Sequence, residues 1–271
     1  MEDAALRIII TALYLVSSAL LIAFIAGVRT RKAGFVAGIA GFAAQTALVV
    51  HLFFSGSPLA GGLGKSLFLF SWFAVMAFLF LSFESKIRAS ALGAFVFTLA
   101  FITTAPSVLP PAGLDAPSPL VTQPVIQTHI ALIFLGQAFF FVAFVAAVLY
   151  LFRERRIKKG TLSTNSNGSF LPITGLDRVQ HISLIYGFPL ATLGLAMGFF
   201  SASQMNADWS WSKKETLSVV TWLIYAFLIN GRFAYGWKGR KSSFGAIAGF
   251  IAVIAVFFAS YYIIPGWHTF G

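Results

Sequence analysis

Histidines are the residues of this chain best suited to bind a metal ion or a metal-containing cofactor. The 271-residue sequence contains four histidines and no cysteine, which excludes disulfides, thiolate ligands, iron–sulfur clusters and cysteine nucleophiles. His129 and His268 are both expected at the outer ends of membrane helices, on one side of the membrane. A single histidine at a membrane boundary is usually a hydrogen-bonded surface residue, but two at equal depth could ligate a metal.

Tryptophans accompany these two histidines on the side where both are expected. Trp209 and Trp211 are two residues apart in a polar segment, Trp222 lies in the helix that follows, and Trp267 directly precedes His268. A lone tryptophan there would usually be an interfacial anchor. Two neutral imidazoles beside an aromatic, apolar surface would give a haem its axial ligands and exclude water, so the pattern favours haem as the cofactor.

Other chemistry has weaker support in the sequence. A zinc site is an alternative, but the outer carboxylates Asp115, Asp208 and Glu215 show no spacing of the HExxH kind. Lys213 and Lys214 could pair with haem propionates, although solvated lysines are the more common case. No nucleophile or acid–base pair is evident, so we predict no catalytic residues within this chain.

The elements that must position these residues are membrane helices. Charged residues make up 10% of the chain, hydrophobic residues 58%, and the mean hydropathy is +0.86, whereas soluble domains carry about 25% charged residues. A helix of about 20 apolar residues crosses the bilayer core, and because lipid offers no backbone partners, the expected fold is an all-α polytopic bundle. Eight such spans are predicted, at about 8–28, 34–54, 67–83, 89–105, 128–152, 182–202, 217–233 and 244–264.

Prolines divide this series of spans into two groups of four. Six prolines fall within residues 106–127, which predicts a long non-helical connection. The expected organisation is therefore four N-terminal transmembrane helices in residues 1–105, an outer proline-rich loop at 106–127, and a second group of four in residues 128–271. The spans are expected to hold no internal Asp, Glu, Lys or Arg and no inverted repeat, which disfavours a transporter.

The positive charges predict the orientation in the membrane. Fifteen of the 19 Lys and Arg residues fall in the connections after the first, third, fifth and seventh spans, and the positive-inside rule places these connections in the cytoplasm. Both termini are then outside. The net charge of +11 is explained by topology, and no nucleic-acid partner is required. Residues 1–28 begin with an acidic segment, so we interpret them as a retained helix rather than a signal peptide.

Residues 119–271 resemble the Trp-rich (WWD) domain of the haem-handling cytochrome c assembly proteins of the CcsA, ResC and CcmC type, and the first four spans resemble them loosely. The likeness rests on the order of several motifs. These are QTH at 127–129, a basic connection, LDR at 176–178, GFP at 187–189, WSWSKKET at 209–216, TW at 221–222 and PGWH at 265–268.

This resemblance implies a function and a site. It implies that His129 and His268 are the axial ligands of a non-covalent, b-type haem, and that Trp209 and Trp211 cradle it. It also implies a membrane subunit of the ResB or CcsB type as partner, and delivery of haem to apocytochrome c at the outer face of the bacterial inner membrane. The chain would then be at most a haem-handling subunit of a cytochrome c synthase.

The sequence also departs from the family pattern. Ser212 and Lys213 replace an Asp-Pro pair, Asn230 stands where many members have a histidine, and Lys65 replaces a glutamate. His51 falls where the family commonly has arginine, so it is assigned no role. These departures keep open an alternative, a HemX-like membrane protein that regulates haem synthesis or supply.

Overall fold

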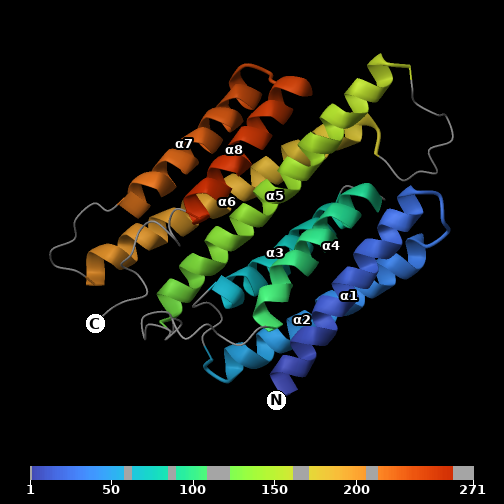
Figure 1. Ribbon diagram of the computed structural model, residues 1–271. Coiled ribbons are helices and arrows are strands. Elements are labelled where there is room, and N and C mark those ends of the chain that lie inside the picture. Colours follow the sequence, from blue (N-terminus) through green and yellow to red (C-terminus); the bar gives the residue numbers. More distant parts are fainter. Residues whose placement is uncertain are drawn as a thin grey trace.

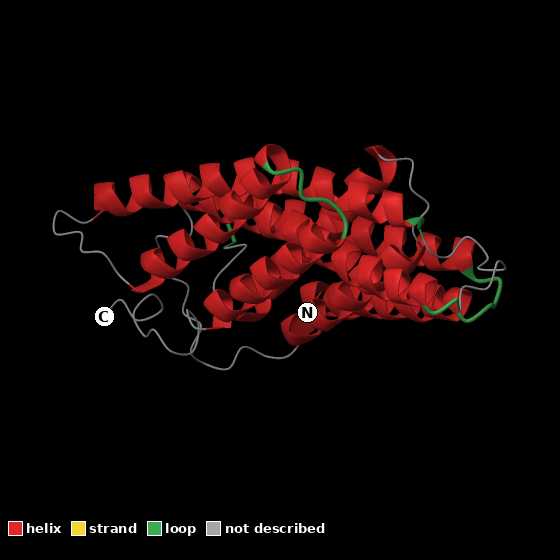
Figure 2. Ribbon diagram, turned by 90° about the horizontal axis from the view of Figure 1, so that it is seen from above, coloured by secondary structure: helices red, strands yellow, loops and turns green. Residues whose placement is uncertain are grey.

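The described part of the chain is entirely helical. A computed structural model describes residues 2–57, 63–84, 90–108, 123–160, 171–205 and 213–258, and Figure 2 shows helices and loops but no strand in these ranges. The elements are α1 (Glu2–Ile25), α2 (Arg31–Phe54), α3 (Leu63–Glu84), α4 (Ser90–Thr104), the 3₁₀ helix η1 (Ala105–Val108), α5 (Pro124–Lys158), α6 (Ile173–Met205), α7 (Lys213–Ala234) and α8 (Arg240–Phe258). The predicted all-α membrane bundle is confirmed.

Most of these helices match the thickness of a bilayer. Seven helical segments of the described residues are long and apolar enough to cross a membrane. The eighth predicted span, 244–264, extends beyond Phe258, where the described part of α8 ends. Helix α5 has 35 residues, about 52 Å at 1.5 Å per residue, so it extends well past the hydrocarbon core.

Successive helices run in opposite directions, so α1 begins and α8 ends on the same side of the bundle (Figure 1). The start of α1 and the described end of α8 thus agree with an even number of spans, and the residues after Phe258 lie outside the described part of the chain. Helices α1 to α4 form one group and α5 to α8 another, and α3 packs against α5 to join them. The division falls between η1 and α5, within the predicted proline-rich connection, although α5 already begins at Pro124.

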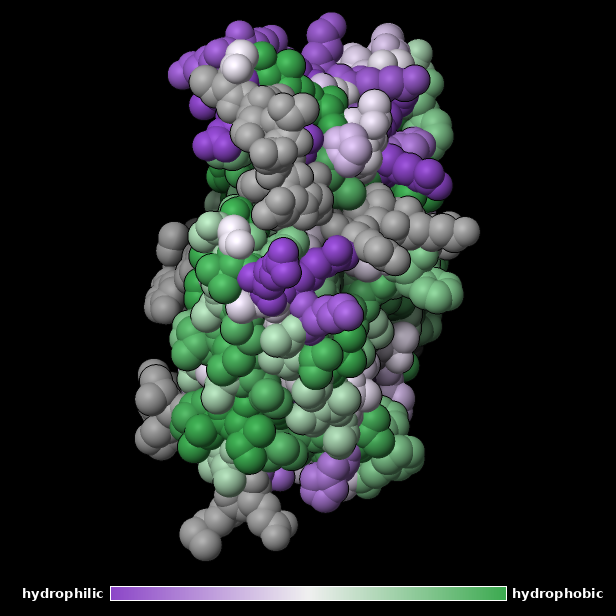
Figure 3. Space-filling model, turned by 90° about the vertical axis from the view of Figure 1, so that its right-hand side faces the viewer, coloured by the Kyte–Doolittle hydropathy of each residue, from purple (hydrophilic) through white to green (hydrophobic). Residues whose placement is uncertain are grey.

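Hydrophobic and hydrophilic residues occupy different levels along the axis of the bundle. On the face drawn in Figure 3, hydrophobic residues predominate in the lower half above a small hydrophilic patch at the bottom, whereas hydrophilic residues gather near the top and in a second patch below it. The last turn of α5 is basic, with Arg155, Arg156 and Lys158. The positive-inside rule assigns the end of the bundle that carries this last turn of α5 to the cytoplasm.

A buried amide connects the first three helices. Gln45 in α2 is fully buried. The Tyr14 hydroxyl of α1 donates to its Oε1 at 2.6 Å, and its Nε2 donates to the Phe68 carbonyl and to Ser71 Oγ of α3, each at 2.8 Å. Interior polar groups in a membrane bundle hold helices together when each of them has a partner.

Replacing Gln45 with leucine is expected to lower the stability of the N-terminal group by about 1–2 kcal/mol, because the buried Tyr14 hydroxyl then has no acceptor. The double variant Gln45→Leu/Tyr14→Phe is the matched control. It removes both partners and should recover part of the loss. Thermal unfolding in detergent measures both changes, and a double variant less stable than the single would contradict this account.

Candidate functional site

His129 lies in the second turn of α5 and contacts α6. Its Nδ1 is 2.6 Å from the carbonyl oxygen of Gly194. A carbonyl can only accept, so Nδ1 carries the proton and Nε2 is the basic nitrogen of the neutral ring. Metal-ligating histidines are commonly oriented in this way, with one ring nitrogen donating to a carbonyl while the other binds the metal.

Glycines allow α6 to approach the imidazole this closely. A Cβ atom added at Gly198 would lie 2.6 Å from Cε1 of His129, and one added at Gly194 would lie 2.9 Å from Cδ1 of Ile133. Both distances are shorter than real contacts allow. The face of α6 opposite His129 is therefore bare backbone, and this backbone supplies both the hydrogen-bond acceptor and the space for the ring.

Trp222 packs α7 against α6 in the same group of helices. Its Nε1 donates to Thr192 Oγ1 at 2.9 Å, and its ring stacks on Phe188 with centroids 5.5 Å apart. An interfacial anchor would contact mainly lipid headgroups. Trp222 instead makes specific contacts inside the bundle.

A small cavity lies between α5, α6, α7 and α8. It has a volume of about 80 Å³ and is lined by Trp222, Ile133, Gln137 and Tyr225 among others. Within the described residues, Gln137 Oε1 and the Tyr225 hydroxyl are buried without a hydrogen-bond partner. Ile133 and Gln137 follow His129 at intervals of four residues, so the cavity continues along the same face of α5. Its polar atoms and its volume suit a few water molecules.

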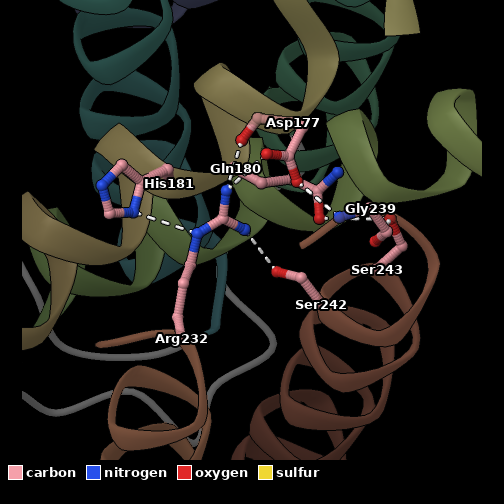
Figure 4. A network of polar contacts seen from close by, with 7 residues as sticks. All are labelled: Asp177, Gln180, His181, Arg232, Gly239, Ser242 and Ser243. Carbon is pink, nitrogen blue, oxygen red and sulfur yellow. Dashed lines mark hydrogen bonds and ion pairs between the residues drawn. The ribbon is translucent and has the colours of Figure 1, made fainter. Parts of the chain in front are cut away.

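A second polar cluster joins the start of α6, the end of α7 and the start of α8 (Figure 4). At its centre is Arg232 of α7, which is 9% exposed. Its Nη2 lies 2.8 Å from Asp177 Oδ2 and also donates to the Asp177 carbonyl at 3.0 Å, while its Nη1 donates to Ser242 Oγ. The other carboxylate oxygen of Asp177 accepts from the backbone N–H of Gly239 at 2.8 Å.

His181 belongs to this cluster. Arg232 Nε donates to His181 Nδ1 at 3.0 Å, so Nδ1 is the acceptor and the neutral ring carries its proton on Nε2. His181 is therefore a hydrogen-bonded member of the cluster.

Arg232, counted among the fifteen cations of the connections, lies in the last turn of α7. This residue lies within the predicted span 217–233, and its charge is tolerated there because Asp177 neutralises it and several oxygens accept its N–H groups. The sequence signal was available, since Arg232 lies at the end of the seventh predicted span and Asp177 lies five residues before the sixth.

Comparison with known proteins shows what kind of protein carries this site. A family described as cytochrome C assembly protein matches residues 60–268. The chain belongs to the cytochrome c assembly protein family. The cytochrome c biogenesis protein CcsA of Guillardia theta is 26% identical over 229 residues, which cover 76% of this chain and 74% of that protein. The CcsA protein of Prochlorococcus marinus (strain MIT 9312) is 29% identical over 162 residues, or 53% of this chain and 52% of the relative.

Membership of the cytochrome c assembly family confirms the resemblance found in the motifs. At these identities the chain is a divergent relative of CcsA. The family match includes every predicted site residue, from His129 to His268. Together with the helices, it makes this chain a multi-pass membrane protein of cytochrome c biogenesis.

The structure describes only some of the predicted site residues of this family member. His129 and Trp222 are described and belong to the same group of helices, whereas Trp209, Trp211, Trp267 and His268 lie outside the described residues. The pairing of His129 with His268 therefore stays a prediction. His51 is exposed on α2, and the described ranges contain no group of three or more histidine and carboxylate residues that could hold a metal ion.

Proposed function

We propose that this cytochrome c assembly protein binds haem non-covalently at the outer face of the bacterial cytoplasmic membrane and holds it for attachment to apocytochrome c. The observation that supports this most is the hydrogen bond between His129 Nδ1 and the Gly194 carbonyl, because it orients the imidazole in the way that is common for metal-ligating histidines. His268 is the proposed second axial ligand.

The residues around the histidines would exclude water from the bound haem. Trp209 and Trp211 are the proposed cradle, Trp267 is next to the second ligand, and Trp222 packs the helix that follows Trp211 against α6. Haem itself supplies the reactive vinyl groups, and this chain positions it. The bond-forming sulfur atoms come from the apocytochrome, since this chain contains no cysteine. A membrane subunit of the ResB or CcsB type is the proposed partner.

Deleting the gene tests the proposed function directly. The expected result is loss of covalent haem from c-type cytochromes, measured by haem staining of denaturing gels, with total non-covalent haem little changed. Complementation with the wild-type gene should restore the stain, and complementation with a His268→Ala variant should not. Normal c-type cytochromes in the deletion strain would overturn the proposal, and a fall in total haem would favour the HemX-like alternative.

Substituting Gly198 with alanine is expected to lower haem retention without removing a ligand, because the new methyl group would collide with the His129 ring. Gly175→Ala is the matched control, since it lies in the same helix and its Cβ would meet nothing closer than 3.7 Å. The haem-to-protein ratio of purified variants measures the effect. Equal ratios for the two variants would contradict the close contact between His129 and Gly198.

A further inference from the structure

A second cavity opens on the side of the bundle where α1 begins, away from the cavity beside Trp222. It has a volume of about 230 Å³ and lies between α1, α2 and α3. Its charged lining residues are Arg7, Lys65 and Asp3, and its apolar wall includes Val49, Leu52 and Leu69. Figure 1 shows that α1 and α3 both begin at this side, where α2 ends.

Arg7 is held in place by an aromatic ring, and the nearby Asp3 acts on it electrostatically without forming an ion pair. Its guanidinium carbon lies 4.9 Å from the centre of the Phe68 ring, and the side chain is half-buried. Among the described residues, the guanidinium makes no hydrogen bond and no ion pair within 4.0 Å, and the same holds for the half-buried Lys65. Partly burying a cation costs free energy that a hydrogen-bonded anion would recover.

The charges of the cavity favour an anion. Two cations face one carboxylate, and Asp3 is exposed and forms no ion pair with a described residue. The N-termini of α1 and α3 add partial positive charge at this side. The cavity therefore has a net positive potential next to an apolar wall.

We propose that this cavity binds an oxyanion, a phosphate or a carboxylate, through Arg7 and Lys65. The planar guanidinium can donate to two oxygens of one such group, and the Lys65 ammonium adds a second donor group. Two sources share this chemistry: the headgroup of an anionic lipid, whose chains would extend along the apolar wall, and a free anion from the outer solution.

Thermal unfolding of the purified full-length chain, free of haem and in a neutral detergent, tests the proposal. Unfolding is followed by tryptophan fluorescence while inorganic phosphate, acetate or phosphatidylglycerol is added, with chloride and phosphatidylcholine as controls. We expect a saturable rise in Tm with phosphatidylglycerol or with the free oxyanions, and none with the controls. A response to phosphatidylglycerol alone identifies a lipid headgroup, and a response to phosphate or acetate identifies a free anion.

Two variants locate the site, and a third is the control. Arg7→Gln should weaken the apparent affinity about tenfold or more, the usual effect of losing a charge-assisted hydrogen bond, and Lys65→Gln should weaken it less. Arg29→Gln removes an exposed cation near the end of α1 that lies away from this cavity and should respond as the wild type does. No saturable response in the wild type, or wild-type affinity in both Arg7→Gln and Lys65→Gln, would overturn the proposal.

Discussion

Replacing His129 with alanine is expected to reduce the haem that copurifies with this protein at least about tenfold, because an axial ligand contributes more than the 1.4 kcal/mol that a tenfold change in affinity requires. His51→Ala is the matched control. His51 is exposed on α2 and has no proposed role, so its loss should leave the haem content unchanged. The haem-to-protein ratio of the purified variants, measured by the pyridine haemochrome assay, reports the effect.

A rescue experiment separates ligation by His129 from a structural effect of the substitution. His129→Gly removes the whole side chain, and added imidazole should then restore haem binding by occupying the space between α5 and the Gly198 backbone. Imidazole should not restore haem binding to a His129→Gly/Gly198→Ala double variant, because there the methyl group occupies part of that space. Wild-type haem content in His129→Ala would contradict the role of His129 as a ligand.

Replacing Asp177 with asparagine is expected to destabilise the C-terminal group of helices by about 3 kcal/mol. The Arg232 side chain is 6% exposed, and removing its counter-charge leaves a buried cation unpaired, which is much costlier than losing a surface ion pair. The measurement is thermal or denaturant unfolding of the purified protein in detergent, with Tm or the transition midpoint compared with the wild type.

Two further variants test the reason for this loss. Glu154→Gln breaks the ion pair with Lys158, whose side chain is 60% exposed, and should leave stability unchanged. Asp177→Asn/Arg232→Met removes both buried charges and should be more stable than Asp177→Asn alone. If Asp177→Asn and Glu154→Gln lower the stability by the same amount, the burial of Arg232 does not explain the contribution of Asp177 to stability.

The helical fold was predictable because hydropathy alone marks runs of membrane length, and the positions of the spans agree with the helices. The helix ends were less predictable. Helix α5 continues to Lys158, past the predicted end at 152, because Glu154 and Lys158 form an i,i+4 pair outside the apolar run. Helix α6 begins at Ile173 rather than near 182, because Asp177 is paired with Arg232 and does not end the helix.

Residues 105–108 give a smaller correction of the same kind. The prolines predicted a non-helical connection from residue 106, but Ala105–Val108 forms a 3₁₀ turn. Pro106 is tolerated there because a residue at the start of a helix needs no N–H partner.

The site itself was only partly predictable. The residue type, spacing and expected depth of His129 pointed to a ligand, but its contact with Gly194 joins residues 65 positions apart, and no local pattern reports such a contact. The same is true of the bond from Arg232 to Asp177, 55 residues away. Sequence patterns indicate which residues can do chemistry, whereas helix packing decides which hydrogen-bond partners they meet.

The central claim is that His129 and His268 together ligate one haem, and the absorption spectrum of the purified protein in its oxidised and reduced forms tests it most directly. The account predicts a six-coordinate, low-spin haem in the wild type and loss of that low-spin signature in both His129→Ala and His268→Ala. A double variant that retained low-spin haem at the wild-type level would contradict it.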